Sequence, residues 1–220
     1  MSNAARLDMA RLTRASMTEA ALALADRDRG LARILRAYGP PPLWARPASY
    51  PTLVLIILEQ QVSLASARSA FHRLTDRVGE VTPERILELG PTQIRALGLT
   101  RQKARYVVEL ASALTSGDLS LRRVARMNDE DARGALTTVP GIGRWTANIY
   151  LLMALRRPDV WPVYDLALRH SFKRLRGLRE APSDDELATK ARRWRPYRSV
   201  AARLLWHYYL KEASPRLPSL

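Results

Sequence analysis

The chain has 220 residues, of which 47% are hydrophobic, a size and composition that suit one globular domain or two small lobes. Its formal net charge of +15 and sequence pI near 11.0 predict a polyanionic partner, above all nucleic acid. The absence of cysteine excludes disulfides, cysteine-ligated zinc and cysteine-ligated iron–sulfur clusters. The three histidines lack ligand spacing, so we expect no metal and no cofactor.

No segment reaches the length of a membrane span, and the N-terminus lacks the apolar core of a signal peptide. The basic charge is spread along the chain and forms no terminal block, which disfavours a protein that merely coats a membrane or a ribosome. We therefore expect a cytoplasmic protein, nucleoid-associated if bacterial, with no membrane contact and no obligatory protein partner.

Hydrophobic periodicity is helical almost throughout, so the expected fold class is all-α. A first helix is predicted over about 18–38, ended by Gly39 and a run of prolines. A second helix begins at Ser49 and is apolar nearly all round over 53–58, so it should be buried. It leads into the polar segment 59–63. Further helices are predicted at 64–78, 83–89, 91–96, 101–114, 121–127, 129–136 with Asn128 as N-cap, 144–155, 166–175, 184–191 and 197–212.

A short turn, Pro140-Gly141-Ile142-Gly143, joins two of these predicted helices. Two glycines bracket an apolar residue that can plug the turn into the core, so that backbone N–H groups at the start of the next helix face outward. Such groups, together with the helix dipole, favour a phosphate oxygen. The turn therefore predicts contact with a nucleic-acid backbone, and an ordinary connection between two helices is the alternative.

Asp165 directly precedes a predicted helix and is the candidate catalytic carboxylate. A role as helix N-cap is the simplest interpretation, but the two roles are compatible because a helix N-terminus favours an ionised carboxylate. An ionised aspartate is what oxocarbenium chemistry at a sugar carbon requires. Asp159 is the nearby rival and is more typical of a residue that ends a turn.

Residues 140–147, followed by a proline-containing loop and Asp165, resemble the helix-hairpin-helix DNA glycosylase superfamily. The resemblance is to its alkylpurine branch, the 3-methyladenine DNA glycosylase II type. Other stretches that resemble this branch are Ala25-Asp26 with Leu31, residues 56–63, Gly98-Leu99 with 103–106, and residues 194–202. The resemblance runs in colinear order from about Leu22 to Leu210. It departs at the loop before Asp165, which lacks a glycine, and at Glu59, where the family often has a small residue.

The resemblance implies a two-lobed helical fold with the active site in the cleft between the lobes. It implies an N-terminal tail at 1–12, a middle lobe at about 60–155, and an outer lobe at about 13–59 plus 156–220. The implied activity is that of a monofunctional DNA glycosylase in base excision repair. Such an enzyme flips alkylated purines, such as 3-methyladenine or 7-methylguanine, out of double-stranded DNA and hydrolyses the N-glycosidic bond.

The resemblance also implies roles for individual residues, with Asp165 as the catalytic one. The expected substrate-pocket residues are Trp145, Trp161, Tyr164 and Gln60. The expected DNA-binding residues are Gln61, Pro140, Gly141, Ile142, Gly143, Arg144 and Thr146. Core packing is the alternative for the aromatic residues, and capping of the buried helix is the alternative for the two glutamines. A cationic alkylpurine is already a good leaving group, so no general acid is required.

Two other functions stay open on the sequence alone. A bifunctional glycosylase/lyase would need a lysine for a Schiff base. In relatives of that type the lysine lies two residues after the second glycine of the hairpin, where this chain has Trp145, and no lysine lies in the hairpin segment. A non-catalytic helix-hairpin-helix DNA-binding protein is the second alternative, and Asp165 together with the Gln60-Gln61 segment argues against it.

Overall fold

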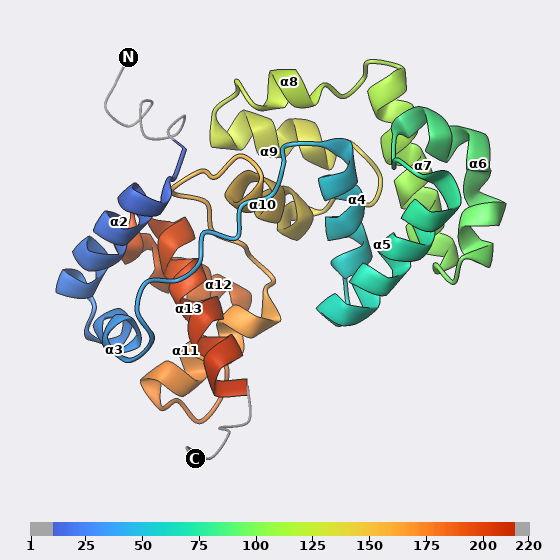
Figure 1. The fold of residues 1–220 in the computed structure, drawn as a ribbon. Helices are drawn as coiled ribbons and strands as arrows, with labels where there is room; N and C mark the ends of the chain where they lie inside the picture. Colours follow the sequence, from blue (N-terminus) through green and yellow to red (C-terminus); the bar gives the residue numbers. More distant parts are fainter. Residues whose placement is uncertain (1–10, 214–220) are drawn as a thin grey trace. The chain divides into compact units, whose positions relative to one another are not determined.

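The computed structural model describes residues 11–213, and every regular element in this range is a helix (Figure 1). The all-α prediction is thereby confirmed. Most of the predicted N-terminal tail, 1–12, lies outside the described residues. None of the described helices combines the length and the apolar character needed to cross a bilayer.

The chain forms two compact units, one made of Met1–Trp44 with Arg156–Leu220 (unit 1) and one made of Ala45–Leu155 (unit 2). The helices of unit 1 are α2 (Arg14–Arg27), α3 (Arg29–Tyr38), α11 (Leu166–Arg176), α12 (Asp184–Ala191), the 3-10 helix η1 (Arg192–Trp194) and α13 (Arg198–Ala213). The helices of unit 2 are α4 (Tyr50–Glu59), α5 (Leu64–Val78), α6 (Pro83–Ala96), α7 (Arg101–Thr115), α8 (Leu121–Val124), α9 (Asp129–Thr137) and α10 (Arg144–Met153).

The division between the units differs from the predicted lobes at helix α4. The sequence analysis grouped residues 13–59 together, but α4 belongs to the same unit as the hairpin. The physical reason is its apolar surface: α4 is buried on nearly every side and packs against α5, α7 and α10. The prediction that this helix is buried is confirmed.

Unit 1 is built around α13, which packs against α2, α3 and α11 (Figure 1). The prediction of a single helix over 18–38 is wrong in one respect, because the chain breaks at Asp28 into two helices, α2 and α3. The Asp28 carboxylate accepts hydrogen bonds from the N–H groups of Gly30 and Leu31 and so caps α3. The local signal of this break is Asp28, a residue type that favours helix N-caps, with Gly30 two positions later, and the sequence analysis did not use it.

Asp28 is also the centre of a buried polar network in unit 1. Arg176 binds both carboxylate oxygens at 2.5 and 2.7 Å, and the indole N–H of Trp194 donates to Oδ2 at 2.9 Å. Burial raises the pKa of Asp28, but the hydrogen bonds from Trp194 and Leu31 and the charge of Arg176 outweigh it, so the pKa is lowered. Trp194 packs on Trp161, with ring centroids 5.5 Å apart. The network therefore supports the loop that leads to Asp165.

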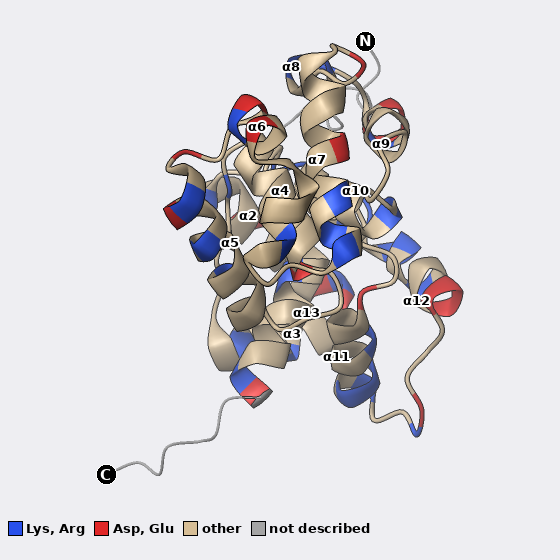
Figure 2. Cartoon of the chain, turned by 90° about the vertical axis from the view of Figure 1, so that its right-hand side faces the viewer, with Lys and Arg blue, Asp and Glu red and all other residues tan. Residues whose placement is uncertain are grey.

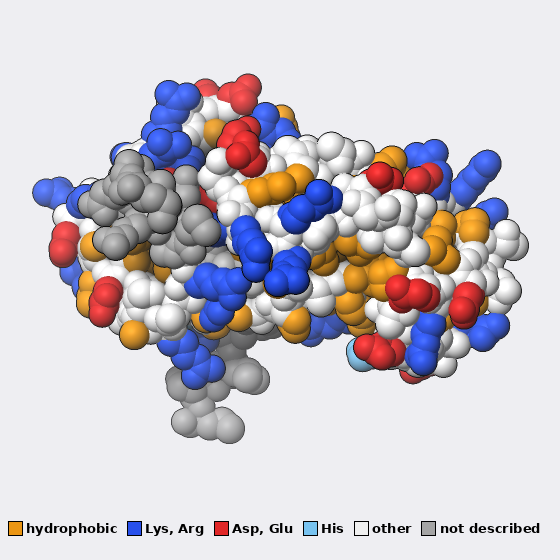
Figure 3. Space-filling view, turned by 90° about the horizontal axis from the view of Figure 1, so that it is seen from above, with side chains coloured by type: hydrophobic (Ala, Val, Ile, Leu, Met, Phe, Trp, Pro, Cys, Tyr) orange, Lys and Arg blue, Asp and Glu red, His pale blue; other side chains and the backbone are white. Residues whose placement is uncertain are grey.

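Basic side chains lie on helices of both units (Figure 2). On the face shown in Figure 3, several Lys and Arg side chains gather near the middle of the view and others lie toward its edges, among acidic and apolar ones. The positive charge predicted to attract a polyanion is therefore distributed over the molecule, in agreement with its spread along the sequence.

Candidate active site

The hairpin between α9 and α10 has the form that its sequence predicted. Ile142 is 3% exposed and plugs the turn into the core of unit 2. Gly141 has φ +91°, and a Cβ there would lie 2.2 Å from Cγ of Tyr106 on α7. Only glycine fits that position. Gly143 is different, because its φ is −83° and a Cβ there would meet no atom within 4 Å.

The outward side of this hairpin carries unengaged backbone donors. Gly143 is the N-cap of α10 and provides no side chain to cap it. Within residues 11–213, the N–H groups of Gly141 and Gly143 donate to no protein acceptor, whereas the N–H of Ile142 donates to the carbonyl of Val139. Pro140, Gly143 and Arg144 are exposed. Such an arrangement can bind an oxyanion with backbone groups alone.

Gln60, predicted to line the pocket, and Thr146, predicted to bind DNA, are hydrogen-bonded to each other within unit 2. The side-chain amide of Gln60 donates to the carbonyl of Gly141 and to the hydroxyl of Thr146, both at 2.9 Å. Thr146 is 1% exposed. Gln60 thus ties the end of α4 to the hairpin, and the Thr146 hydroxyl is engaged within the protein.

Gln61, the next residue, is exposed and has φ +57°, in the left-handed region that few non-glycine residues adopt. Val62 and Leu64 follow, and their side chains are 46% and 50% exposed. The turn after α4 therefore exposes a polar side chain, Gln61, followed by two exposed apolar side chains.

Asp165 is the N-cap of α11, where its Oδ1 accepts a hydrogen bond from the N–H of Leu168 at 3.0 Å. The same oxygen accepts a bond from the indole N–H of Trp206 on α13 at 3.1 Å. The residue is 9% exposed. A backbone donor and an aromatic donor thus fix the orientation of this carboxylate.

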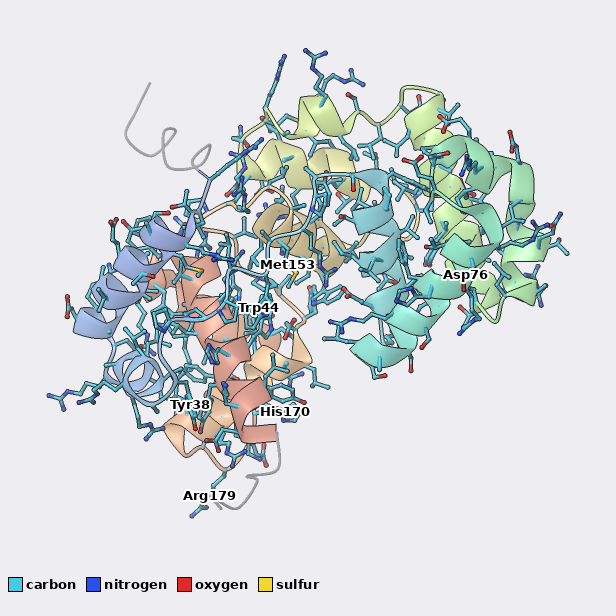
Figure 4. The ribbon with its side chains drawn as sticks, in the orientation of Figure 1. Tyr38, Trp44, Asp76, Met153, His170 and Arg179 are labelled. Carbon is cyan, nitrogen blue, oxygen red and sulfur yellow. The ribbon has the colours of Figure 1, made fainter. Side chains whose placement is uncertain are left out.

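Trp206 and Trp44 are site residues that the sequence analysis missed. Trp206 lies in the last helix, and Trp44 lies edge-on to it with ring centroids 6.5 Å apart and planes at 68° (Figure 4). His207, beside Trp206, also contacts the Trp44 ring, and burial lowers its pKa. Nothing in the local pattern around either tryptophan connects it to Asp165, which is distant in sequence.

The predicted aromatic pocket residues occupy different environments. Trp161 is 6% exposed and packs on Trp194, which matches the core-packing alternative. Tyr164 is 62% exposed with φ +64°, directly before Asp165. Trp145 is half-buried at the start of α10. Among the described residues, no group of acidic or histidine side chains is arranged to hold a metal ion.

Asp159, the rival of Asp165, and Glu59, a departure from the family pattern, each have a partner within their own unit. Asp159 lies in a turn, as expected, and also binds the guanidinium of Arg198 and its backbone N–H, at the start of α13. Glu59 forms a bidentate ion pair with Arg46, with N–O distances of 2.7 and 2.9 Å. These partners give both residues structural roles.

A family model described as the HhH-GPD superfamily of base excision DNA repair proteins matches residues 54–196. The match includes the C-terminal part of α4, the hairpin and Asp165 in a single stretch. The chain belongs to this family. HhH-GPD membership agrees with the all-helical fold and with the geometry of the hairpin.

Relatives within the HhH-GPD family include proteins named as glycosylases. DNA-3-methyladenine glycosylase of Bacillus subtilis is 34% identical over 184 residues, covering 78% of this chain and 59% of the relative. DNA-3-methyladenine glycosylase 1 of Schizosaccharomyces pombe is 28% identical over 198 residues, covering 87% of each protein. This chain thus spans less than two thirds of the length of the Bacillus relative.

A solved structure of the Schizosaccharomyces pombe 3-methyladenine DNA glycosylase Mag1, in complex with abasic DNA, is also similar. It superposes with a TM-score of 0.81 at 25% sequence identity, covering 91% of this chain and all of that chain. The similarity in fold therefore extends well beyond the residues that the family model matches.

Proposed function

We propose that this protein is a monofunctional DNA glycosylase that excises alkylated purines, 3-methyladenine and 7-methylguanine among them, from double-stranded DNA. The observation that carries the proposal is the carboxylate of Asp165, held at the N-terminus of α11 by Leu168 and Trp206. The proposal is further supported by membership of a base excision repair family and by the names of the relatives.

Asp165 is the catalytic residue in this proposal. Cleavage of an N-glycosidic bond develops positive charge on the deoxyribose ring, and an ionised carboxylate stabilises that charge and orients the attacking water. The bonds from Leu168 and Trp206 orient the carboxylate in advance, so little reorganisation is needed in the transition state.

The leaving group in this reaction is a base that already carries positive charge. It departs without a protein acid, which fits the environment of Glu59, the acidic residue at which the chain departs from the family pattern. Glu59 is bound by Arg46 through both carboxylate oxygens, so both oxygens are already engaged within unit 2. The proposal therefore predicts slow processing of neutral lesions such as hypoxanthine and uracil.

The hairpin binds the DNA backbone through the N–H groups of Gly141 and Gly143, with Arg144 adding charge. Gln61 enters the duplex at the position vacated by the flipped nucleotide, because its turn exposes it beside the apolar Val62. Gln60 holds the turn to the hairpin. Because the hairpin belongs to unit 2 and Asp165 to unit 1, the proposal requires DNA to contact both units.

Aromatic side chains near Asp165 supply the surface on which the electron-poor base stacks. Tyr164 is exposed at the residue before Asp165, and the half-buried Trp44 lies edge-on to Trp206, which is itself buried. A cation over such a ring gains about 0.5–2 kcal/mol. We assign Trp161 to support of the loop, since it packs on Trp194. A DNA-repair role also implies action where the chromosome lies, in the cytoplasm or nucleoid of a bacterium.

The deciding experiment is Asp165→Asn, assayed for base release and for binding to a duplex with one 7-methylguanine. We expect release to fall by at least about a thousandfold, because the loss of transition-state charge stabilisation costs roughly 4 kcal/mol or more. Binding should stay intact or tighten, since removal of a negative charge reduces repulsion from phosphate. Near-wild-type release by this variant would refute the assignment, and release accompanied by strand cleavage in the wild type would favour a bifunctional enzyme.

A further inference from the structure

The C-terminal end of α4 is held in unit 2 by three separate polar contacts. The side chain of Glu59, its last residue, is bound by Arg46. The carbonyl of Leu58 accepts a hydrogen bond from Nζ of Lys103 at 2.7 Å. Gln60 binds the hairpin carbonyl of Gly141 at 2.9 Å. The turn that carries Gln61 therefore starts from a fixed base.

Glu59 is an unfavourable residue at this position unless it is paired. Its side chain is 5% exposed, and an unpaired buried carboxylate carries a large desolvation penalty. It also lies at the helix C-terminus, where the dipole disfavours negative charge. Arg46, with a side chain 22% exposed, offsets both effects through its bidentate pair.

A pair of this kind contributes little net stability, because desolvation of both ions largely cancels their attraction. The pair instead fixes the geometry of the two side chains, because two parallel N–H donors of the planar guanidinium bind both oxygens of the carboxylate. The pair sits two residues before Gln61, which already has a left-handed backbone. Its main effect is therefore on the position of the turn.

Arg46 also connects the end of α4 to the far end of the hairpin helix. Its backbone N–H donates to the carbonyl of Met153, the last residue of α10, at 3.1 Å. Gln60 binds Thr146 in the first turn of the same helix. The turn with Gln61 is thus anchored, directly or through Arg46, at both ends of the helix whose N-terminus carries the hairpin amides.

We propose that the Arg46–Glu59 ion pair is a positioning device that pre-orders the Gln61 turn for insertion into the duplex; this inference rests on the insertion role proposed for Gln61. A mobile turn would lose conformational entropy when it inserts into the duplex, which costs free energy. The fixed turn has already lost that entropy on folding. The pair therefore favours the flipped state of the nucleotide while making no contact with the base.

The consequence depends on how firmly the damaged base is stacked and paired. A lesion in a fully paired duplex needs insertion of Gln61 to stay flipped, whereas a lesion in a single strand has no pairing to break. Loss of the pair should slow base release from the duplex by roughly tenfold, the effect of leaving about one residue unordered. Release from the single strand should change by less than about twofold, because Asp165 is untouched.

The test uses single-turnover release of 7-methylguanine from a duplex and from the same strand alone. The main variant is Arg46→Met with Glu59→Met, which keeps the net charge and replaces a buried ion pair by apolar side chains of similar length. Glu59→Gln is the second variant, because it keeps a hydrogen-bonding group toward Arg46 while removing the charge. Thermal unfolding of each protein verifies that the variants are folded. Gln61→Ala is measured in parallel.

We expect the ratio of the release rate from duplex to that from single strand to fall about tenfold in the double-methionine variant. In Glu59→Gln the ratio should fall by less. An unchanged ratio, or an equal loss on both substrates, overturns the role of the pair. If Gln61→Ala also leaves the ratio unchanged, the insertion role of Gln61 fails as well. If Gln61→Ala lowers the ratio and the pair variants do not, only the inference about Arg46 and Glu59 fails.

Discussion

Trp206 donates its indole N–H to Oδ1 of Asp165 across 3.1 Å, linking α13 to the N-terminus of α11. The bond gives the proposed catalytic carboxylate a second fixed donor besides the backbone N–H of Leu168. It also places the buried ring of Trp206 against the carboxylate, so this residue orients Asp165 from the core of unit 1.

We predict that Trp206→Phe lowers the rate of base release by about 10- to 100-fold with intact DNA binding. A hydrogen bond to a charged group contributes about 1.5–3 kcal/mol, and phenylalanine keeps an aromatic ring but has no donor. Single-turnover kinetics on a duplex with 7-methylguanine measure the effect. Tyr209→Phe is the matched control, because Tyr209 lies on the same helix and is 40% exposed. A Trp206→Phe enzyme as fast as this control would contradict the role of the indole.

The hairpin role is tested by comparing two substitutions of Gly143. Its φ is −83° and a Cβ there would meet no atom within 4 Å, so alanine fits, whereas proline also removes the backbone N–H. We expect Gly143→Pro to weaken binding to damaged and undamaged duplex equally, since backbone amides bind phosphate and carry no lesion information.

Gly143→Ala should bind both duplexes like the wild type, and wild-type affinity should fall steeply with salt. Fluorescence anisotropy titrations at several salt concentrations make the comparison. Equal affinities for the alanine and proline variants, or a loss confined to damaged DNA, would mean that the amide does not hold phosphate. Gly141 offers no such pair of variants, because a Cβ there would overlap the ring of Tyr106.

Asp28 should make stability depend on pH. Its pKa is lowered in the folded protein despite burial, because Trp194 and Arg176 bind the charged form. A depressed folded pKa contributes stability that is present above the unfolded value, near 4, and is lost as pH falls through the folded pKa. We expect Asp28→Asn to lower the free energy of unfolding by about 3–5 kcal/mol at pH 7.

The difference between wild type and Asp28→Asn should shrink as the pH falls from about 4 toward the lower folded pKa, below which Asp28 is protonated in both states. Urea denaturation at pH 7, 5, 4 and 3 follows this difference. Asp184→Asn serves as the comparison, since its distance to Arg169 is 3.8 Å and the contact is partly exposed. A difference that stays constant from pH 7 to pH 3 would show that Asp28 acts through its shape and not its charge.

Borohydride should trap no covalent adduct between the protein and damaged DNA, and the product should be an intact abasic strand. The hairpin has Trp145 where a lyase would carry its lysine. Burial lowers the pKa of Lys103, but its Nζ donates a hydrogen bond to the carbonyl of Leu58 and so binds the end of α4. Denaturing gels with and without borohydride provide the measurement, with Lys103→Met run beside the wild type. An adduct in the wild type would reopen the bifunctional alternative.

Local features of this protein could be predicted from the sequence because each rests on neighbouring residues. The helical period located nearly every helix, Asn128 was identified as the cap of α9, and the apolar run at 53–58 predicted a buried helix. Gly141 and Ile142 behave as their pattern indicated, since a positive φ and a buried plug are properties of the turn itself. Asp165 as an N-cap belongs to the same class.

Only the tertiary structure decided which side chains meet. The Gln60 amide reaches the hairpin across 81 positions of sequence, and the indole of Trp206 reaches Asp165 across 41. The side chain of Glu59 reads as an isolated acid in the sequence, but Arg46 pairs with it in the folded unit. Such pairings arise from packing between helices, which no local period encodes. The sequence by itself therefore determined the elements and the hairpin, while packing within each unit determined the partners of Asp165, Gln60 and Glu59.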